Sequence, residues 1–516
     1  MNNLPVLDIA IIIIYLIAMV LVGVYFSRRN NSAEEFTKAA GKIPAWAIGI
    51  SLYATFLSSN TFLGVPGKAF GSNWNAFVFS LSMPIAAWFA AKYFVPFYRS
   101  HTEVSAYTNL EKRFGRWARS YAVICFLLTQ IARMGSIFFG ISLTLQALTG
   151  FDMALIMIVT GVCIIVYTVL GGLEAVIWTE VAQGILLTIG ALIIIGTLVY
   201  NIPGGVSTIV DIGIRDDKFS LGSFSLTDFS SSTFWVILLY GVFINMTNFG
   251  MDQNYVQRYH AAPNQKDAAK SVWMCVWLYV PISLLFFIIG ACLYAYYDVN
   301  QDLLTPIKEQ VLQERGLNGS AVIGSLTPAD YGDKVLPNYM VTHIPVGIVG
   351  LIVSAILAAA MSTISSGMNA SATVFTEDIY KRYINPKTSD KQSLRILLIG
   401  TGVFGTIGML AGIAMIGVES ILDAWWTLSG IFAGGMLGLF LLGLISKKVK
   451  NNDALIGTII GICVILWMTF SYLIPDQYAY LRNPLHANMI IVVGTLSIFL
   501  AGNLSRKLRE KAKEQG

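Results

Sequence analysis

The sequence predicts an all-α integral membrane protein of about thirteen transmembrane helices, because long apolar runs recur along a chain with little charge. Of its 516 residues, 55% are hydrophobic and 12% are charged, which is about half the charged share of soluble domains. Uncharged runs such as 9–27 and 272–297 have the roughly 20 residues that cross a hydrocarbon core of about 30 Å. Their recurrence argues against a soluble enzyme that contains a buried helix.

Thirteen segments are expected to span the membrane. The segment near 340–380 is too long for one crossing, so we expect it to tilt or to extend into water. The first segment has no basic residue before it and no small-residue cleavage site after it, which indicates a retained span rather than a signal peptide. The expected spans are 5–27, 45–70, 75–97, 119–149, 154–171, 175–200, 232–255, 271–297, 340–380, 395–417, 420–445, 453–474 and 486–505.

The basic residues are distributed among the loops as thirteen crossings require. Of the 34 Lys and Arg residues, 25 fall in one set of alternate loops and ends, six fall in the opposite set, and three fall within spans. Because cytoplasmic loops are rich in Lys and Arg, we place the first set, which includes Arg258 and the C-terminal tail, in the cytoplasm. The sequence therefore predicts a multi-pass protein of the plasma membrane with its N-terminus outside and its C-terminus inside.

The second and seventh spans contain polar and helix-breaking residues. The second contains Ser58–Thr61 and then Pro66, and the seventh contains Asn245–Gly250 and then Asp252. Proline cannot donate to the helix ladder, and Asn and Gly favour local unwinding. Kinks for packing are one explanation. However, polar breaks in a membrane are costly unless they line a site, and matched breaks in two halves indicate the substrate site of a transporter.

The spacing of these two breaks predicts an inverted repeat. They lie five spans apart, and because five is odd, the corresponding helices run in opposite directions. Spans 2–6 and 7–11 then form the two repeats, with flanking spans at both ends. The expected division is 1–44 for the N-terminal span and cytoplasmic loop, 45–200 for the first repeat, 201–231 for an extracellular loop, 232–445 for the second repeat with its extracellular loop 298–339, and 446–516 for the C-terminal spans and basic tail.

The ninth span has a helix face made of small hydroxyl residues. Ala359, Ser362, Thr363 and Ser366 follow the spacing i, i+3, i+4 and i+7, and Ser365 borders the face that they share. Such residues often only allow two helices to pack closely. The alternative is an oxygen-rich surface for a hard monovalent cation, completed by carbonyls that a broken helix leaves free.

Two ionisable residues fall within expected spans. Arg133 lies in the fourth span, where a buried arginine needs an anion and its planar fork suits a carboxylate. The alternative is an ion pair between helices. Glu180 lies in the sixth span, within a turn or two of the cytoplasmic end. It either reaches the membrane surface or neutralises a cation.

With these motifs, the chain resembles the sodium:solute symporter family over essentially its whole length. The resemblance rests on the segment 358–383 (AAAMSTISSGMNASATVFTEDIYKRY) and on Phe249–Arg258. Within the family, the chain is most similar to bacterial sialic acid transporters, chiefly through Ser58–Thr61 and Ala132–Gly135. The resemblance implies the five-plus-five inverted repeat of the leucine-transporter type, with flanking helices, and sodium-coupled uptake of a small carboxylated solute such as sialic acid.

The resemblance also implies which residues form the sites. For a first sodium ion it implies the backbone carbonyls of Ala54, Leu57 and Ala359 and the hydroxyls of Ser362 and Thr363. For a second sodium ion it implies Ser362, Ser365, Ser366 and the acid Glu180, where similar sialic acid transporters have Asp. For the substrate it implies that Arg133 faces the carboxylate, beside Ser58, Asn60 and Thr61, with Asn245 and Ser80 as further contacts.

Other functions remain open on the sequence. The same fold could transport another small carboxylate as its cargo, such as an amino acid or a monocarboxylate. A sensor with a transporter-like fold usually adds a signalling domain, and the tail after Leu504 is short for one. The five Cys and four His residues lack metal-ligand spacing, so we expect no enzyme. The expected partners are sodium, an anionic small molecule and lipid, without nucleic acid, and the monomer is expected to be functional.

Overall fold

A computed structural model describes residues 4–27, 32–57, 59–100, 103–314, 323–416 and 421–515. These residues fold almost entirely into helices. Within these residues, ten helices are long and apolar enough to cross a membrane, and a bent pair forms an eleventh span. The longest helix, Met153–Asn201, has 49 residues and is interrupted by Gly172 at φ 58°. At 1.5 Å per residue its two parts together measure about 74 Å along the helix axis, enough for two crossings. With the apolar helix segment Gly430–Ile445, each of the thirteen expected spans corresponds to a helical segment.

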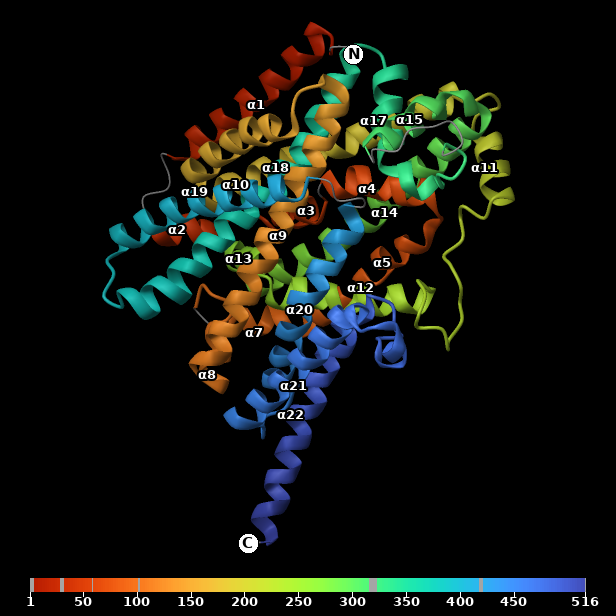
Figure 1. Cartoon of the computed structure of the whole chain (residues 1–516). Coiled ribbons are helices and arrows are strands. Elements are labelled where there is room, and N and C mark those ends of the chain that lie inside the picture. Colours follow the sequence, from red (N-terminus) through yellow and green to blue (C-terminus); the bar gives the residue numbers. More distant parts are fainter. Residues whose placement is uncertain are drawn as a thin grey trace.

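The first half of the chain contains three connecting helices, α2, α8 and α11, and the expected spans up to residue 201. Its third span is a continuous run of short helical segments with a π-helical part at Ala90–Phe94. Its helices (Figure 1) are α1 (Val6–Ser27), α2 (Ala33–Lys38), α3 (Ala45–Phe56), α4 (Ser59–Gly71), α5 (Val78–Leu81), α6 (Met83–Phe89), α7 (Val95–Arg99), α8 (Thr108–Phe114), α9 (Arg116–Thr149), α10 (Met153–Asn201) and α11 (Val206–Arg215).

The second half contains the remaining spans and the longest outer loop. This outer loop contains α15, and residues 315–322 after it lie outside the described residues. The helices are α12 (Phe234–Met251), α13 (Gln253–Ala261), α14 (Gln265–Val299), α15 (Thr305–Glu314), α17 (Pro328–His343), α18 (Ile348–Val374), a π-helical continuation (Phe375–Ile384), α19 (Asp390–Ala414), α20 (Ile421–Ile445), α21 (Asn451–Phe470) and α22 (Met489–Gln515).

Two spans are broken, as predicted; the breaks lie at the end of α3, just before the polar segment that starts at Ser58, and at Asp252, rather than at Pro66 or within Asn245–Gly250. The second span bends by 52° between α3 and α4, while Pro66 lies inside α4. The seventh span breaks at Asp252, which has extended backbone between α12 and α13, while Asn245–Gly250 remains helical. The glycines and the proline serve close packing instead: a Cβ on Gly290 of α14 would lie 2.6 Å from the carbonyl oxygen of Pro66.

The ninth span begins later than expected. Residues 340–343 belong to α17, and α18 starts at Ile348 after Gly347, whose φ is 87°. The amides of Gly347 and Gly350 donate to the Asp8 carboxylate at 2.8 and 2.6 Å, so α1 caps the start of this helix. From Ile348 to Ile384 the span has 37 residues, which still exceeds one perpendicular crossing.

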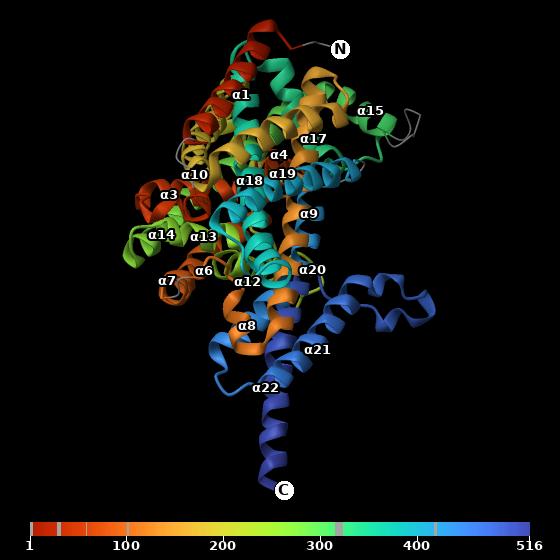
Figure 2. The ribbon, with the colours of Figure 1, turned by 90° about the vertical axis from the view of Figure 1, so that its left-hand side faces the viewer.

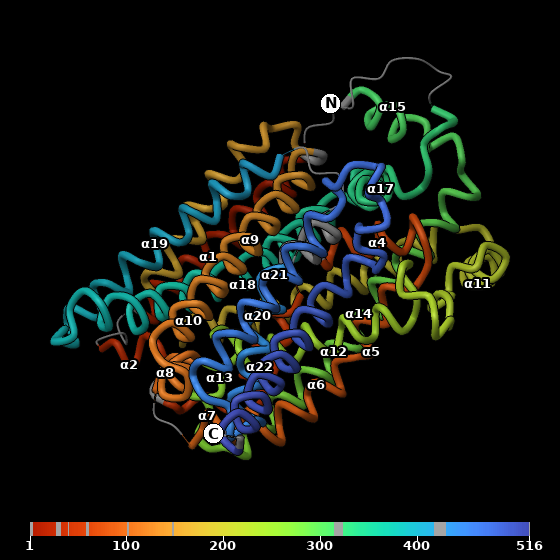
Figure 3. The backbone as a smooth tube through the Cα atoms, turned by 60° about the horizontal axis from the view of Figure 1, so that its bottom comes forward, coloured from red at the N-terminus to blue at the C-terminus, as the bar shows by residue number. Residues whose placement is uncertain are grey.

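Helix α18 lies at the centre of the molecule. In its most apolar window 89% of the residues are buried, against 11% for α1, because α3, α9, α10 and α19 surround it. Figure 3 shows α9, α18 and α19 side by side, and α17 packs against α4. Helix α22 extends beyond the other helices, and its end lies opposite the start of α1 (Figure 2).

Candidate functional site

The end of α3 provides backbone oxygens that the helix does not use. Because α3 ends at Phe56, the carbonyls of its last turn have no amide of a following turn to accept from. The Leu57 amide donates to Tyr53 at 3.2 Å, which leaves the carbonyls of Ala54, Thr55 and Leu57 to contact α18. The partial negative charge at the C-terminal end of a helix favours a cation there.

Two hydroxyls of α18 meet these carbonyls. The Ser362 Oγ lies 3.2 Å from the Ala54 carbonyl oxygen and 2.9 Å from that of Ala359. The Thr363 Oγ1 lies 3.4 Å from the Leu57 carbonyl oxygen and 3.3 Å from that of Ala359. The structure therefore brings together all five residues that the resemblance implied for a first sodium site.

The separations of these oxygens fit a shared cation. Distances of 3.2 to 3.4 Å from the two hydroxyls to Ala54 and Leu57 exceed the usual O–H···O distance of about 2.7–2.8 Å. Oxygens that bind one hard cation at about 2.4 Å and at right angles lie about 3.4 Å apart. The set carries no full charge, which suits a monovalent ion. The sequence-based prediction omitted Thr55, whose carbonyl lies 3.5 Å from the Thr363 Oγ1.

Arg133 of α9 lies where the two helix breaks meet. Its Nη2 donates to the Thr55 carbonyl at 2.8 Å, and its Nη1 lies 3.7 Å from the Asp252 Oδ2. Asp252 caps α13 by accepting from the Asn254 amide at 2.8 Å, and it accepts from the Gln130 side chain at 3.1 Å. The ion pair between helices that the sequence left open is therefore present, but it is long.

The other residues implied for the substrate lie on α4, α5 and α12. Ser58 lies outside the described residues, as does the side chain of Asn60, and Thr61 is buried on α4. The Ser80 Oγ lies 2.7 Å from the Ser283 Oγ of α14. The Asn245 side chain donates to the Ser82 Oγ at 3.1 Å. Ser80 and Asn245 are thus buried hydrogen-bonding groups between the first and second halves of the chain.

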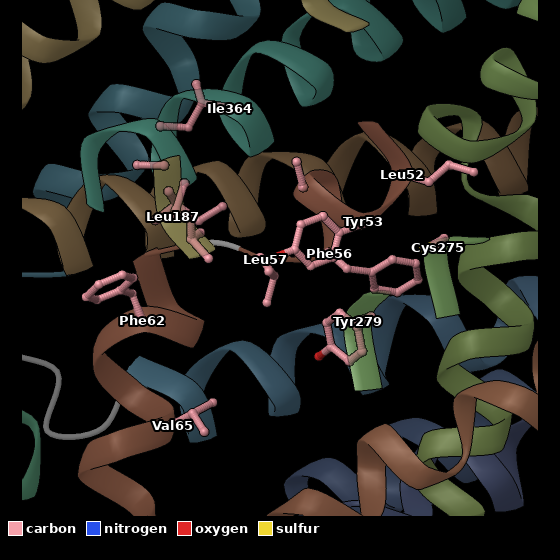
Figure 4. Packing of buried hydrophobic residues seen from close by; sticks show 14 of the residues in the cluster. Leu52, Tyr53, Phe56, Leu57, Phe62, Val65, Leu187, Cys275, Tyr279 and Ile364 are labelled. Carbon is pink, nitrogen blue, oxygen red and sulfur yellow. The ribbon is translucent and has the colours of Figure 1, made fainter. Parts of the chain in front are cut away.

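Aromatic side chains pack beside the α3 break. Figure 4 shows Phe56 next to Tyr279 of α14, with Leu57 at the end of α3. The Phe56 ring centroid lies 5.5 Å from that of Tyr279, 4.8 Å from that of Tyr255 and 5.4 Å from that of Phe249. These rings tie the break in the second span to both segments of the broken seventh span.

Glu180 of α10 is paired with an arginine that sequence analysis placed elsewhere. One guanidinium nitrogen of Arg258 lies 2.7 and 2.8 Å from the two Glu180 oxygens. The hydroxyls of Ser51 and Ser366 also donate to Glu180, and the Thr55 Oγ1 donates to it at 3.3 Å. The carboxylate is fully buried, and its oxygens are surrounded by donors and one full positive charge.

The Arg258 guanidinium contacts two of the residues that the resemblance implied for a second sodium ion, Glu180 and Ser366. The structure brings Glu180 and Ser366 together as predicted, but the Ser365 Oγ donates to the Ser362 carbonyl at 3.1 Å. A cation about 4 Å from the Arg258 charge would be repelled by about 4 kcal/mol at an effective dielectric constant of about 20. The Arg258 guanidinium would have to move before a second cation could use this carboxylate.

The expectation that Arg258 lies in a cytoplasmic loop was wrong. All nine residues of α13 are buried, and Arg258 is 1% exposed. Its Nε donates to the Ser51 Oγ at 2.8 Å, and its Nη1 donates to the Asn254 carbonyl at 2.5 Å. The sequence did contain a sign that Arg258 is buried. Polar side chains are dense from Asp252 to Arg258, directly after a span, and such side chains need hydrogen-bonding partners within the protein.

Comparison with known proteins agrees with this architecture. The model of the sodium:solute symporter family matches residues 36–461. The sodium/sialic acid symporter NanT of Aliivibrio fischeri is 34% identical over 94% of this chain and 91% of its own, and SiaT of Proteus mirabilis is 33% identical over 98% and 96%. A solved structure of a Na⁺-coupled sialic acid symporter, substrate-bound and outward-open with a novel Na⁺ site, superposes with a TM-score of 0.86 at 31% identity over 98% of both chains. The family model, the two relatives and the arrangement of helices and breaks agree, so the chain belongs to the sodium:solute symporter family.

Proposed function

We propose that this protein is a sodium-coupled secondary active symporter that imports sialic acid, such as N-acetylneuraminic acid, by alternating access. The names of NanT and SiaT as sodium/sialic acid symporters support this cargo. The observation that carries the proposal is the position of Arg133. Its guanidinium and the Thr363 hydroxyl both contact the Thr55 carbonyl oxygen, at 2.8 and 3.5 Å, so a cation for a carboxylate lies directly beside the sodium-binding oxygens.

Arg133 binds the substrate carboxylate in this proposal. An arginine fork binds a carboxylate through two parallel charge-assisted hydrogen bonds, whereas Asp252 is 3.7 Å away through one oxygen. The substrate therefore replaces a weak partner with a strong one. Residues Ser58, Asn60, Thr61, Asn245 and Ser80 are proposed to contact the remaining polar groups of the sugar acid.

Sodium at the first site prepares Arg133 for the substrate. The ion fixes the end of α3 against Ser362 and Thr363, which holds the Thr55 carbonyl that accepts from Arg133. Because binding energies of coupled sites are reciprocal, bound substrate strengthens sodium binding by the same factor. The contact between α3 and α18 is the one that is proposed to change when the site opens to the other side.

The proposed movement is rocking of the two broken helices and their neighbours against the remaining scaffold. It uses the two repeats 45–200 and 232–445, with 1–44 and 446–516 as flanking segments and a single chain as the working unit. The segregation of basic residues supports an N-terminus outside the cell and a C-terminus in the cytoplasm. Labelling of single cysteines introduced at each end of intact cells tests that orientation.

Uptake by purified protein in liposomes tests the function. An inward sodium gradient should drive uptake of radiolabelled N-acetylneuraminic acid, and replacing sodium by potassium should abolish it. Ser362→Ala and Arg133→Ala should both abolish sodium-driven uptake. Ser354→Ala is a matched control, because this buried hydroxyl of the same helix bonds only its own helix, donating to the Gly350 carbonyl at 2.8 Å. Full uptake by the Ser362 variant would refute the sodium site.

Competition experiments decide between cargoes. An excess of unlabelled sialic acid should block the uptake, whereas amino acids and monocarboxylates at the same concentration should leave it unchanged. If a monocarboxylate competes as strongly as sialic acid, the fold and the sodium site stand and the cargo assignment fails.

A further inference from the structure

The candidate site contains a second positive charge besides Arg133, the guanidinium of Arg258. Arg258 is 1% exposed and Glu180 is fully buried, so water solvates neither charge. The guanidinium lies within 2.8 Å of both carboxylate oxygens and donates to the Ser366 Oγ at 2.6 Å. Ser366 and Glu180 are two of the residues from which a second sodium site would be built.

The two groups of oxygens next to α18 differ in what binds them. Around Ser362 and Thr363, the oxygens are neutral and lie 3.2 to 3.4 Å from Ala54 and Leu57, which leaves them able to share an ion. Around Glu180, the oxygens are contacted by a guanidinium and by the hydroxyls of Ser51 and Ser366. The positive charge next to Glu180 is thus a side chain of the protein, the Arg258 guanidinium, rather than an ion from solution.

We propose that Arg258 is a tethered cation that occupies the second cation position at Glu180, so that the protein transports one sodium ion for each substrate. This inference concerns stoichiometry and rests on the proposed function. The arginine is anchored by its own helix as well, since its Nη1 donates to the Asn254 carbonyl at 2.5 Å. It therefore stays with the protein throughout the cycle and stores no energy from the sodium gradient.

One sodium ion with one monoanionic substrate moves no net charge. Uptake is then independent of membrane potential, and a tenfold sodium gradient supports at most about tenfold accumulation. Two sodium ions would raise that limit to about a hundredfold without any potential, and would make uptake respond to the potential as well. The two stoichiometries therefore differ in both the size and the voltage dependence of accumulation.

The direct test measures radioactive sodium and labelled sialic acid entering the same liposomes. The wild-type flux ratio is expected to be one, with uptake unchanged when valinomycin and a potassium gradient impose an inside-negative potential. A wild-type ratio of two overturns the proposal, and it does so without any variant.

Substitutions at Arg258 test the cause. Arg258→Gln leaves Glu180 without its positive partner, so a sodium ion should replace the guanidinium and the flux ratio should rise to two. Arg258→Lys keeps the tethered charge and should remain at one. The double variant Glu180→Gln/Arg258→Gln removes both charges and should also remain at one. A folded Arg258→Gln protein with a ratio of one would overturn the proposal, and if this variant does not fold, the wild-type ratio decides.

Sodium binding without substrate separates this inference from the proposed function. Thermal stabilisation of detergent-purified protein by sodium should follow a single-site curve for the wild type and a two-site curve for Arg258→Gln, with potassium chloride keeping the ionic strength constant. These curves stay interpretable even if sialic acid is not the cargo. A two-site curve for the wild type would contradict the tethered cation, whereas failed sialic acid uptake with a single-site curve would contradict only the cargo.

Discussion

Arg133, which is partly buried, and Arg258, which is fully buried, are held in opposite ways. Arg133 has a long contact of 3.7 Å to one oxygen of Asp252, whereas Arg258 lies 2.7 and 2.8 Å from both oxygens of Glu180. Removing one member of a tight buried pair leaves the other charge buried without its partner in the protein, which is costly. A loose pair can exchange its anion at little cost. This difference indicates that Arg258 is a fixed part of the protein and that Arg133 is available to a ligand.

The largest effect is expected from breaking the tight pair. Glu180→Gln should destabilise the protein by about 3–5 kcal/mol, because it leaves the Arg258 charge buried without a carboxylate. The double variant with Arg258→Gln should regain most of this loss, since neither charge then remains. Melting temperatures in detergent for the two single variants and the double variant measure the coupling. A double variant no more stable than Glu180→Gln would show that the pair does not act as a unit.

A smaller loss, in substrate affinity, is expected when a lysine replaces Arg133 and keeps the charge without the planar guanidinium. Arg133→Lys should weaken sialic acid binding by roughly 10- to 100-fold, or about 1.4–2.7 kcal/mol, because an ammonium group lacks the fork that matches a carboxylate. Calorimetric titration of sialic acid in saturating sodium measures this change. Sodium-induced stabilisation without substrate should be retained, and its loss would instead make Arg133 part of the sodium site.

Removing the competing carboxylate of the loose pair should have a modest effect of opposite sign. Asp252→Asn should tighten sialic acid binding roughly two- to fivefold, or about 0.5–1 kcal/mol, since Arg133 then has no anion to give up. Asparagine also caps helices well, so α13 should keep its start. Weaker substrate binding by a folded Asp252→Asn variant would show that Asp252 supports Arg133 rather than competing with the ligand.

The smallest effect is expected at the residue that connects both arginines. The Thr55 carbonyl accepts from Arg133, and its hydroxyl donates to the Ser51 carbonyl at 2.8 Å and lies 3.3 Å from a Glu180 oxygen. Thr55→Val removes only the hydroxyl, which should cost about 0.5–1.5 kcal/mol of stability and change sodium affinity by less than about twofold. Equilibrium sodium titrations of wild type and variant provide the comparison. A tenfold loss of sodium affinity would mean that the hydroxyl, and not the carbonyl, carries the connection.

Most of the fold was predictable because the bilayer imposes a simple rule on length and polarity. Apolar runs such as those of α1 and α14 identify spans without any knowledge of their neighbours. The break positions were less predictable, since Pro66 and Gly67 reflect contacts with α14 and α17 that a single chain segment does not reveal. The broken spans themselves were correct.

The site residues were predictable where side chains follow a regular spacing in the sequence. They were not predictable where a backbone carbonyl or a partner far along the chain forms the contact. Ser362 and Thr363 share a helix face in the sequence, whereas the Thr55 carbonyl has no signature in sequence at all. Arg258 was misassigned because counting basic residues treats any arginine after a span as exposed. Its partner Glu180 is 78 residues away along the chain, so only the folded structure joins them.

The cap that α1 provides for α18 has a consequence for biosynthesis. The Gly350 amide, from which the Asp8 carboxylate accepts, is made 342 residues after Asp8. At about 5–20 residues per second, the ribosome needs roughly 20 to 70 s to deliver that partner. During this interval the carboxylate at the start of the first helix must be satisfied by water, lipid headgroups or an insertion factor, so the first helix takes its final place only after the ninth span has emerged.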